Sequence, residues 1–368
     1  MLSSLGSIGW AVAFSLLCAA SAQAQSLHAE TIAKGLAHPW AVAFLPDGRF
    51  LVTERPGRMR VIDRDGRIGA PIAGLPQVDA RGQGGLLDVV LDSGFASNRQ
   101  LYFCFAEPGN GGNSTALASA KLSADAARLE EPHVIFSQRP KVNSTNHFGC
   151  RIVEARDGTL FLTMGERFTR KDDAQNLENH LGKVVRIHKD GSVPRDNPFI
   201  GRAGALPEIW SWGHRNSQGA TLAPDGTFWE MEHGPQGGDE INLPQAGKNY
   251  GWPVITYGEQ YGGGPIGEGI THKAGMEQPL HYWTPSIAPS GMAFLTSGRY
   301  GAAMKGNLFV GSLKFGYIAR LEIEGGKVAR EARALEVGER VRDVRQGPDG
   351  YLYFVTDEDN GRLARITP

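Results

Sequence analysis

A short motif recurs along the chain, in which a turn containing Asp-Gly or Asn is followed by alternating apolar and polar residues. Four copies are clear and two are degenerate: LPDGRFLVTE (45–54), ARDGTLFLTMGE (155–166), APDGTFWEME (223–232) and GPDGYLYFVTDE (347–358), then FASNRQLYFCFAE (95–107) and MKGNLFVGSL (304–313). Asp-Gly favours tight hairpin turns, and a period of two is typical of a strand. The pattern therefore predicts six β-hairpins in similar surroundings.

Further strand-like segments flank these motifs. Apolar runs precede them, as at 40–45, 150–155 and 290–295, and follow them, as at 58–63 and 182–188. Each repeat thus predicts a four-stranded antiparallel sheet, and no long segment after the N-terminus has the 3.6-residue period of a helix. Six such sheets arranged radially form a six-bladed β-propeller, which is the all-β fold we expect. The alternative, a pair of β-sandwiches, explains less well why similar motifs recur in one register.

The two ends of the chain offer a way to close such a ring. Residues 28–36 (HAETIAKGL) and 362–367 (RLARIT) are predicted to complete one blade together. The six turns are spaced more widely than the roughly 40–50 residues of a bare blade. They lie at Gly48, Asn98, Gly158, Gly226, Gly306 and Gly350. Insertions therefore separate some strands, and such insertions gather on one face as binding loops.

Composition supports this fold and narrows the class of partner. Glycine makes up 49 of 368 residues, which fits many tight turns. Hydrophobic residues account for 41% and charged residues for 21%, as in globular proteins. The net charge of −1 gives no electrostatic footprint for nucleic acid or an anionic membrane. We therefore expect no nucleic-acid partner.

The N-terminus predicts export. An apolar segment at 8–20 precedes small-residue cleavage sites around Ala22 and Ala24, which indicates a signal peptide over residues 1–24. The remaining 25–368 would form a single catalytic propeller, periplasmic or secreted, with no membrane span, because the apolar run is too short to cross a bilayer. The first basic residue is Lys34, so the usual basic start of a signal peptide is missing. A buried N-terminal helix is the alternative.

Two cysteines, Cys104 and Cys150, remain once Cys18 is assigned to the signal peptide. In an oxidising compartment they are able to pair, but the sequence does not establish the distance between them. Cys104 lies within an apolar strand-like run, which favours a buried free thiol over a disulfide.

Polar and aromatic residues concentrate in five insertions. These are GQGGLLD (82–88), NHFGCR (146–151), WGHRNSQG (212–219), EHGPQGGDEINLP (232–244) with KNYGWP (248–253), and SLKFG (312–316) with ERVRD (339–343). Taken singly, each has a structural explanation: a turn glutamine, a capped loop histidine, an acidic loop or solvated cations. Together, the series GHRN, GPxxGDEIN and KNYGWP resembles the soluble pyrroloquinoline quinone (PQQ)-dependent aldose sugar dehydrogenases of the glucose/sorbosone dehydrogenase family. The resemblance runs from about Gly35 to Ile366.

The resemblance implies the oxidation of aldose sugars to lactones, with PQQ and calcium as cofactors and hydride transfer from C1 to PQQ. It implies His147 as general base and Arg215 beside the quinone oxygen. The cofactor-binding residues it implies are Gln83, Arg215, Asn216, Lys314, Arg340 and Arg342. Tyr257, Tyr261 and Trp283 are candidate walls for the cofactor or the sugar, with packing among the propeller loops as the structural alternative. It also places the carbonyls of Gly234 and Pro235 on a calcium ion that bridges the quinone, and Glu240 and Tyr250 at a second, structural calcium ion.

These residue types suit that chemistry. PQQ carries three carboxylates, which arginine binds bidentately, and calcium prefers oxygen ligands. Imidazole, with an unperturbed pKa of about 6.5, is largely neutral near pH 7 and so is able to accept the anomeric hydroxyl proton. Two departures from the family pattern stand out: Cys150 replaces a small Gly or Ser close to His147, and Ser217 replaces a proline.

Two other functions remain open at this stage. A calcium-dependent lactonase or esterase on a similar propeller would use calcium and a histidine, but would not need Lys314, Arg340 and Arg342 as a cluster. A non-catalytic glycan-binding propeller would need neither. The chain has no CxxCH haem site, so electrons would leave to a separate acceptor. We expect a monomer or a weak dimer.

Overall fold

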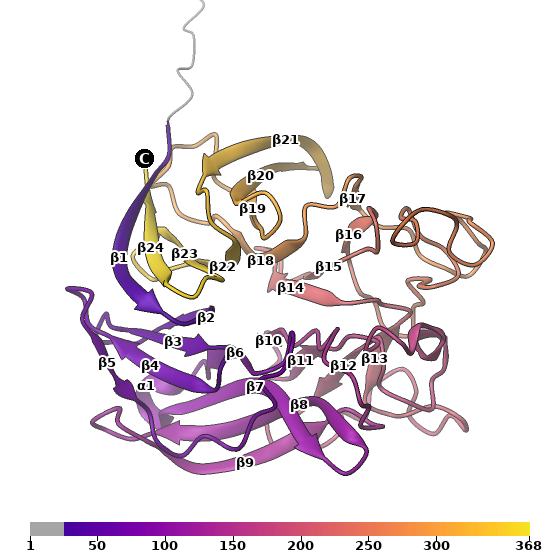
Figure 1. The fold of residues 1–368 in the computed structure, drawn as a ribbon, viewed down its shortest axis with the longest axis horizontal. Helices are drawn as coiled ribbons and strands as arrows, with labels where there is room; N and C mark the ends of the chain where they lie inside the picture. The colour runs from indigo at the N-terminus through magenta and orange to yellow at the C-terminus, as the bar shows by residue number, and fades with distance from the viewer. Residues whose placement is uncertain (1–25) are drawn as a thin grey trace, which may run out of the picture.

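The computed structural model describes residues 26–368, in which six four-stranded antiparallel sheets surround a central axis (Figure 1). This confirms the predicted all-β, six-bladed propeller. Each of the six predicted turns lies between the first and second strand of a sheet, as expected from the recurring motif. The predicted signal peptide over residues 1–24 lies outside the described residues.

The strands follow the repeats in order. The first three blades comprise β2 (Pro39–Phe44), β3 (Phe50–Glu54), β4 (Arg58–Ile62) and β5 (Ile68–Pro71); β6 (Leu86–Leu91), β7 (Gln100–Gly109), β8 (Gly112–Leu122) and β9 (Leu129–Ser137); and β10 (Ile152–Glu154), β11 (Leu160–Thr163), β12 (Lys183–Ile187) and β13 (Ile209–Trp212). The next two comprise β14 (Ser217–Leu222), β15 (Phe228–Glu232), β16 (Asp239–Asn242) and β17 (His281–Trp283); and β18 (Pro289–Phe294), β19 (Leu308–Ser312), β20 (Tyr317–Glu324) and β21 (Lys327–Glu336). The short helices α1 (Phe95–Asn98) and η1 (Lys171–Gln175) lie between strands.

The last blade joins the two ends of the chain. Its strands are β22 (Val341–Gln346), β23 (Leu352–Thr356), β24 (Gly361–Thr367) and β1 (His28–Leu36). β1 pairs antiparallel with β24, from His28 opposite Thr367 to Leu36 opposite Gly361, and the two strands lie side by side in Figure 1. The predicted closure of the ring is confirmed.

Burial follows position in each blade. The first strand lies nearest the axis and is mostly buried, as in β18, where every residue is buried. The outermost strands β9 and β21 face the solvent, and most of their residues are exposed or half-buried. Adjacent blades bury their facing apolar residues against one another, since a blade has no core of its own. Within residues 26–368, no helix has the length and apolarity needed to cross a membrane.

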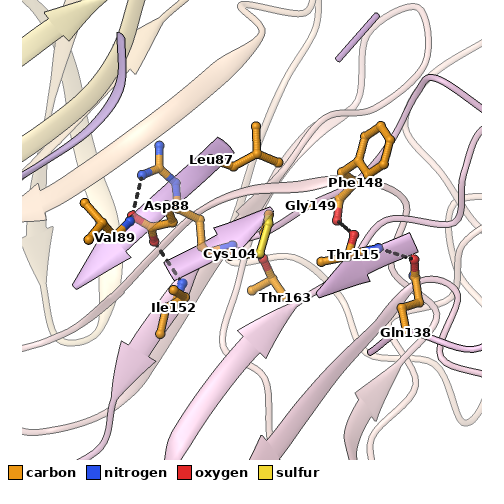
Figure 2. The surroundings of a disulfide bond; sticks show 12 residues. Leu87, Asp88, Val89, Cys104, Thr115, Gln138, Phe148, Gly149, Ile152 and Thr163 are labelled. Carbon is orange, nitrogen blue, oxygen red and sulfur yellow. Dashed lines mark hydrogen bonds and ion pairs between the residues drawn. A yellow bond between two sulfur atoms is a disulfide. The ribbon is translucent and has the colours of Figure 1, made fainter. Parts of the chain in front are cut away.

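Cys104 and Cys150 form a disulfide, so the expectation of a free buried thiol was wrong (Figure 2). Cys104 lies in β7 of the second blade, and Cys150 lies just before β10 of the third. The radial arrangement brings these blades together and leaves the two Cα atoms 5.8 Å apart, within the range that a disulfide bridges. Residue spacing alone carries no information on that proximity.

Candidate active site

A cavity of about 510 Å³ opens at one end of the central axis. Every blade contributes to it, because the inner strands β2, β6, β10, β14, β18 and β22 all begin at this end and run away from it. The residues just before each inner strand, such as Gln83, Gly149 and Asn216, therefore meet around one space. The Asp-Gly turns lie at the opposite ends of these strands. The predicted insertions thus converge on the cavity, as expected for binding loops.

His147 lies in the loop between β9 and β10, beside the cavity-lining Phe148 and Gly149, and is 4% exposed. Its backbone has φ 52°, in the left-handed region, and its N–H donates to Gln83 Oε1 at 2.8 Å. Nδ1 lies 3.2 Å from Glu166 Oε2, at an angle too poor for a well-directed hydrogen bond. Among residues 26–368, no hydrogen-bond partner of Nε2 is found.

The surroundings of His147 keep its ring neutral. Burial lowers the pKa of the imidazole below its usual value; the charge of Glu166 acts to raise that pKa, and Arg215 acts to lower it. Phe168 packs edge-to-face on the ring with centroids 5.2 Å apart. With Nδ1 turned to a carboxylate, the ring presents a free lone pair at Nε2, as a general base requires.

Arg215 is buried behind the cavity rather than in its wall. Its Nη1 donates to the carbonyls of Gly234 at 2.6 Å and His233 at 3.1 Å, and its Nη2 lies 3.4 Å from the hydroxyl of Tyr261. The guanidinium also stacks over Trp252 at 5.2 Å. Arg215 therefore sits against the Gly234 carbonyl that was predicted as a calcium ligand.

Two of the three predicted cofactor cations line the cavity. Arg342 is buried and donates to Gln218 Oε1 at 3.0 Å and Asp357 Oδ2 at 2.6 Å, while its Nε is buried with no acceptor among the described residues. Arg340 is half-exposed and lies 3.9 Å from Asp357. Lys314 follows the cavity residue Leu313 and is exposed, with Nζ 5.1 Å from the ring of its neighbour Phe315. Although burial opposes it, Arg342 holds the pKa of Asp357 well below its usual range.

A buried acidic cluster adjoins this site. Glu230 and Glu232 on β15 lie beside Glu240 on β16, and one ligand atom each of His214, Glu230 and Glu232 lie within 4.8 Å of one another. Burial, and then repulsion from Glu232, raise the pKa of both Glu230 and Glu240 well above the usual value. Tyr250 stacks on His214 at 4.9 Å. The structure thus brings Glu240 and Tyr250 to one place, and adds His214, Glu230 and Glu232 as candidate metal ligands.

The predicted aromatic residues have different surroundings. Tyr261 is 64% exposed and approaches Arg215. Tyr257 stacks on Tyr282 with centroids 3.9 Å apart and donates to Gln278, so its ring is held at the surface. Trp283 is buried, and its indole N–H donates to Glu331 of the next blade. Packing between blades accounts for Trp283, which was the structural alternative for it.

Seven residues of the site were not predicted: Glu166, His214, Gln218, Glu230, Glu232, His233 and Asp357. Glu166, Glu232 and Asp357 lie at or just after the ends of the second strands β11, β15 and β23. Because a second strand runs antiparallel to the inner strand, its end returns to the cavity. Five of the six motif copies end in glutamate, and an acidic residue at or beside this position was therefore the signal for them. Gln218 and His233 line the cavity, and burial lowers the pKa of His233 to about 3.

Comparisons with known proteins agree with this geometry. The sequence model of the family described as glucose / sorbosone dehydrogenase matches residues 36–365. The aldose sugar dehydrogenase YliI of Escherichia coli is 44% identical over 361 residues, covering 96% of this chain and 97% of that protein. A crystal structure of a glucose dehydrogenase is 50% identical, with a TM-score of 0.89, and covers 92% of this chain and 99% of that one.

A further solved structure is the PQQ-bound form of an aldose sugar dehydrogenase from Streptomyces coelicolor. It is 28% identical, with a TM-score of 0.77, and covers 94% of this chain and 99% of its own. The family match spans nearly all of the described propeller, and the Escherichia coli relative covers it as fully. This chain therefore belongs to the glucose / sorbosone dehydrogenase family.

Proposed function

We propose that this protein oxidises aldose sugars to lactones, using PQQ and calcium. The observation that carries the proposal is the buried, neutral His147, whose Nδ1 faces Glu166 and whose Nε2 is free, beside a polar cavity at the propeller axis. The PQQ-bound relative from Streptomyces coelicolor supports the choice of cofactor.

The residues around the cavity fit an anionic cofactor. Its volume of about 510 Å³ is in the range of small-molecule sites. Arg340 and Arg342 line it, and Arg342 has a buried donor without an acceptor within residues 26–368. A carboxylate there would satisfy this group, since arginine binds carboxylates through parallel N–H donors. Arg340, Arg342 and Lys314 would hold the carboxylates, with Gln83, Asn216 and Tyr261 around the rest of the group.

The residues of this chain supply binding, orientation and proton transfer. His147 Nε2 would take the proton of the anomeric hydroxyl, and Glu166 would stabilise the imidazolium that forms at Nδ1. Arg215 would stabilise negative charge beside the Gly234 carbonyl. When bound, PQQ supplies the two-electron acceptor for the hydride that leaves C1. The sugar loses one proton and one hydride, which leaves the C1 carbonyl of the lactone.

The acidic cluster fits a calcium ion. Glu230 Oε1 and Asn242 Oδ1 are buried oxygen atoms with no donor among the described residues, and three carboxylates share the cluster with no lysine or arginine paired to them there. A hard dication with oxygen ligands would satisfy these atoms. We place the structural calcium there with Glu240 and Tyr250, and a second ion at the carbonyls of Gly234 and Pro235.

The deciding experiment is reconstitution of the exported protein with PQQ and Ca²⁺, assayed with an aldose and an artificial electron acceptor. Dye reduction that needs both PQQ and the sugar supports the proposal. Folded protein that reduces no dye would refute it. Hydrolysis of a lactone without PQQ would instead favour the lactonase, and sugar binding without either reaction would favour a glycan-binding propeller.

Removing a predicted cofactor cation should weaken PQQ binding. Arg342→Ala is expected to raise the Kd for PQQ about 10- to 100-fold, because it removes a charged hydrogen-bond donor and leaves Asp357 with only His38 and the more distant Arg340 as partners. Lys314→Ala should have a smaller effect, about tenfold or less, because the side chain is exposed. Titration of PQQ measures both values. The control is Lys305→Ala, which changes an exposed lysine elsewhere on the surface. An unchanged Kd in Arg342→Ala would show that Arg342 does not bind PQQ.

The dependence of kcat/KM on pH should follow the titration of His147. Since the base must be neutral and its pKa is lowered, kcat/KM is expected to stay level near pH 7 and to fall only below pH 6.5, about tenfold per unit. The charge of Glu166 raises this pKa, so Glu166→Gln should move the midpoint to lower pH. A midpoint above 6.5, or a shift of the opposite sign, would contradict the assignment. Steady-state rates between pH 4 and 8 provide the measurement.

We also propose export, with residues 1–24 as the signal peptide and 25–368 as one catalytic propeller. The Cys104–Cys150 disulfide supports this, since such bonds form and persist in oxidising compartments. The periplasm or the medium would then be the site of action, with a separate electron acceptor and a monomer or weak dimer as the active form.

A further inference from the structure

The loop that carries His147 is held in an unfavourable backbone conformation. His147, Gly149 and Cys150 all have positive φ, of 52°, 66° and 85°. Side chains disfavour this region, so His147 and Cys150 keep it only because the surroundings impose it. The His147–Cys150 segment, which we call the histidine loop, therefore depends on its anchors.

The histidine loop packs backbone to backbone on the segment that carries Glu166. A methyl group added to Gly165 would lie 2.1 Å from His147 O, and one added to Gly149 would lie 2.7 Å from Met164 Cα. The N–H of Cys150 donates to Thr163 O at 2.7 Å, and Thr163 ends the strand that leads to Glu166. A displacement at Cys150 would thus change the position of His147 relative to Glu166.

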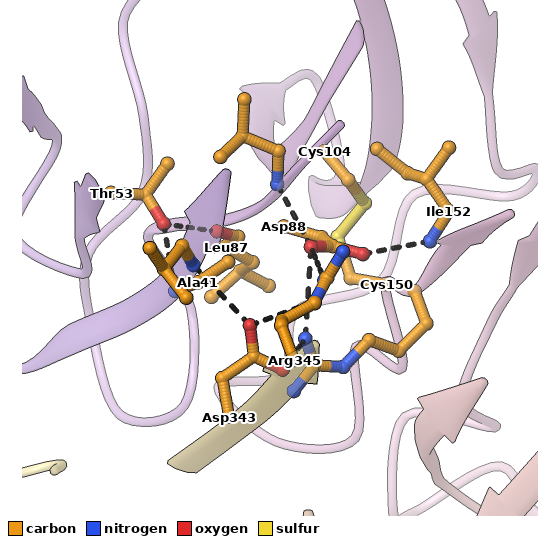
Figure 3. A network of polar contacts seen from close by, with 12 residues as sticks. Ala41, Thr53, Leu87, Asp88, Cys104, Cys150, Ile152, Asp343 and Arg345 are labelled. Atoms are coloured by element: carbon orange, nitrogen blue, oxygen red, sulfur yellow. Dashed lines mark hydrogen bonds and ion pairs between the residues drawn. A yellow bond between two sulfur atoms is a disulfide. The ribbon is translucent and has the colours of Figure 1, made fainter. Parts of the chain in front are cut away.

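On the C-terminal side, the loop is anchored by a polar network with residues of the inner strands β6 and β22 (Figure 3). The N–H of Ile152 donates to Asp88 Oδ2 at 2.9 Å, and Arg151 donates to Asp343 Oδ1 at 2.8 Å. Arg345 joins the same two carboxylates at 2.6 and 3.0 Å. These bonds fix the residues after Cys150, so Cys150 is the point where the strained loop meets a rigid base.

The disulfide acts at that point. Both sulfur-bearing residues are fully buried, and Cys104 lies in the middle of β7, a central strand of the preceding blade. On the other side of the loop, Thr115 of β8 donates to Phe148 O at 2.6 Å (Figure 2). The bond therefore ties the strained end of the histidine loop to the sheet that borders it.

We propose that the Cys104–Cys150 disulfide positions His147 for proton transfer by holding the histidine loop in its left-handed conformation. The inference rests on the proposed role of His147. Cys104 and Cys150 are positioning residues, since neither touches the cavity. Because a misplacement of about 1 Å in a reacting group costs about 100-fold in rate, loss of the bond should act mainly on kcat.

The test compares two variants that lack the bond. Cys104→Ala/Cys150→Ala leaves a side chain at φ 85°, whereas Cys104→Ala/Cys150→Gly leaves a residue that adopts this conformation without strain. We expect kcat to fall about 10- to 100-fold in the first variant and to recover at least fivefold in the second. KM and the Kd for PQQ should stay within about threefold in both.

A matched control separates positioning from stability. Leu308→Ala removes a buried side chain from β19 in another blade and should leave kcat unchanged. In the apo protein, amide hydrogen exchange over residues 143–151 and 163–168 should rise in the alanine double variant and less so in the glycine one. Hydrogen exchange does not depend on enzyme activity. It therefore tests whether the disulfide holds the loop even if the wild-type protein oxidises no aldose.

Each outcome decides the inference. An alanine double variant with wild-type kcat and exchange would overturn it, as would equal losses in both double variants and in Leu308→Ala. If only the glycine variant folds, a kcat within tenfold of wild type, with raised exchange in the loop, supports positioning. If neither folds, the bond is a requirement of the fold, and the inference is wrong. An inactive wild-type protein with raised exchange in the alanine variant refutes the proposed function alone.

Discussion

His147→Ala is expected to lower kcat about 1,000-fold while changing the Kd for PQQ by less than threefold. General-base catalysis contributes about 100- to 10,000-fold, and the imidazole Nε2 is the free proton acceptor that the site offers. The side chain makes no hydrogen bond to a neighbouring blade among the described residues, so its loss leaves the cavity walls in place. Steady-state rates and PQQ titration are the measurements.

Two controls sharpen this result. Free imidazole should restore part of the activity of His147→Ala, since the truncated side chain leaves space beside Glu166, whereas it should not stimulate the wild-type protein. His133→Ala, an exposed histidine on β9, should retain full activity. Loss of PQQ binding in His147→Ala would make His147 a cofactor ligand rather than a base.

Removal of calcium is expected to lower the Tm of the PQQ-free protein by about 6 °C. An ion present at 1,000 times its Kd adds about 4 kcal/mol to the free energy of unfolding. The entropy of unfolding is about 2.1 cal/mol/K per residue, so 1 kcal/mol shifts the Tm of a domain of this length by about 1.4 °C. The Glu230–Glu232–Glu240 cluster is the reason: without a dication, burial and mutual repulsion act on its carboxylates. Thermal unfolding with EDTA, and again after Ca²⁺ is restored, measures the shift.

Removing calcium should reverse the order of the Tm values of Glu230→Gln and the wild-type protein. With calcium present, the variant should melt below the wild type because one ligand charge is lost. Without calcium, it should melt at or above the wild type, since the amide removes repulsion from Glu232. Glu131→Gln, an exposed surface carboxylate, should respond to calcium as the wild type does. If EDTA leaves the wild-type Tm unchanged, calcium does not bind at this cluster.

The fold was predictable because each blade repeats one local rule. Asp-Gly turns and alternating strands are encoded within a few residues. All six predicted turns, from Gly48 to Gly350, lie between the first and second strand of their sheets. Closure by 28–36 and 362–367 followed from the strand pattern of the two ends. One boundary differed: the strand expected at 150–155 begins only at Ile152, since the positive φ of Cys150 interrupts the extended backbone, although its N–H still donates to Thr163 O.

The site was predictable only in part. The motifs pointed to His147, Arg342 and Glu240 as candidates, and the structure places Arg342 in the cavity wall, His147 beside it and Glu240 in the adjoining acidic cluster. Glu166 and Asp357 were missed because the motif shows an acidic residue near the end of the second strand, but not that this strand returns to the cavity. The disulfide was missed for a related reason, since Cys104 and Cys150 meet only through the contact of two blades.

The pairing of β1 with β24 sets the order in which the molecule is able to mature. The Arg362–Thr31 hydrogen bond joins residues 331 positions apart, so the circle stays open until the final strand has been made. Until then β1 has no strand to pair with, and the last blade stays incomplete. Closure of the propeller, and with it the meeting of the six groups of loops around the cavity, therefore has to wait for the C-terminal strand.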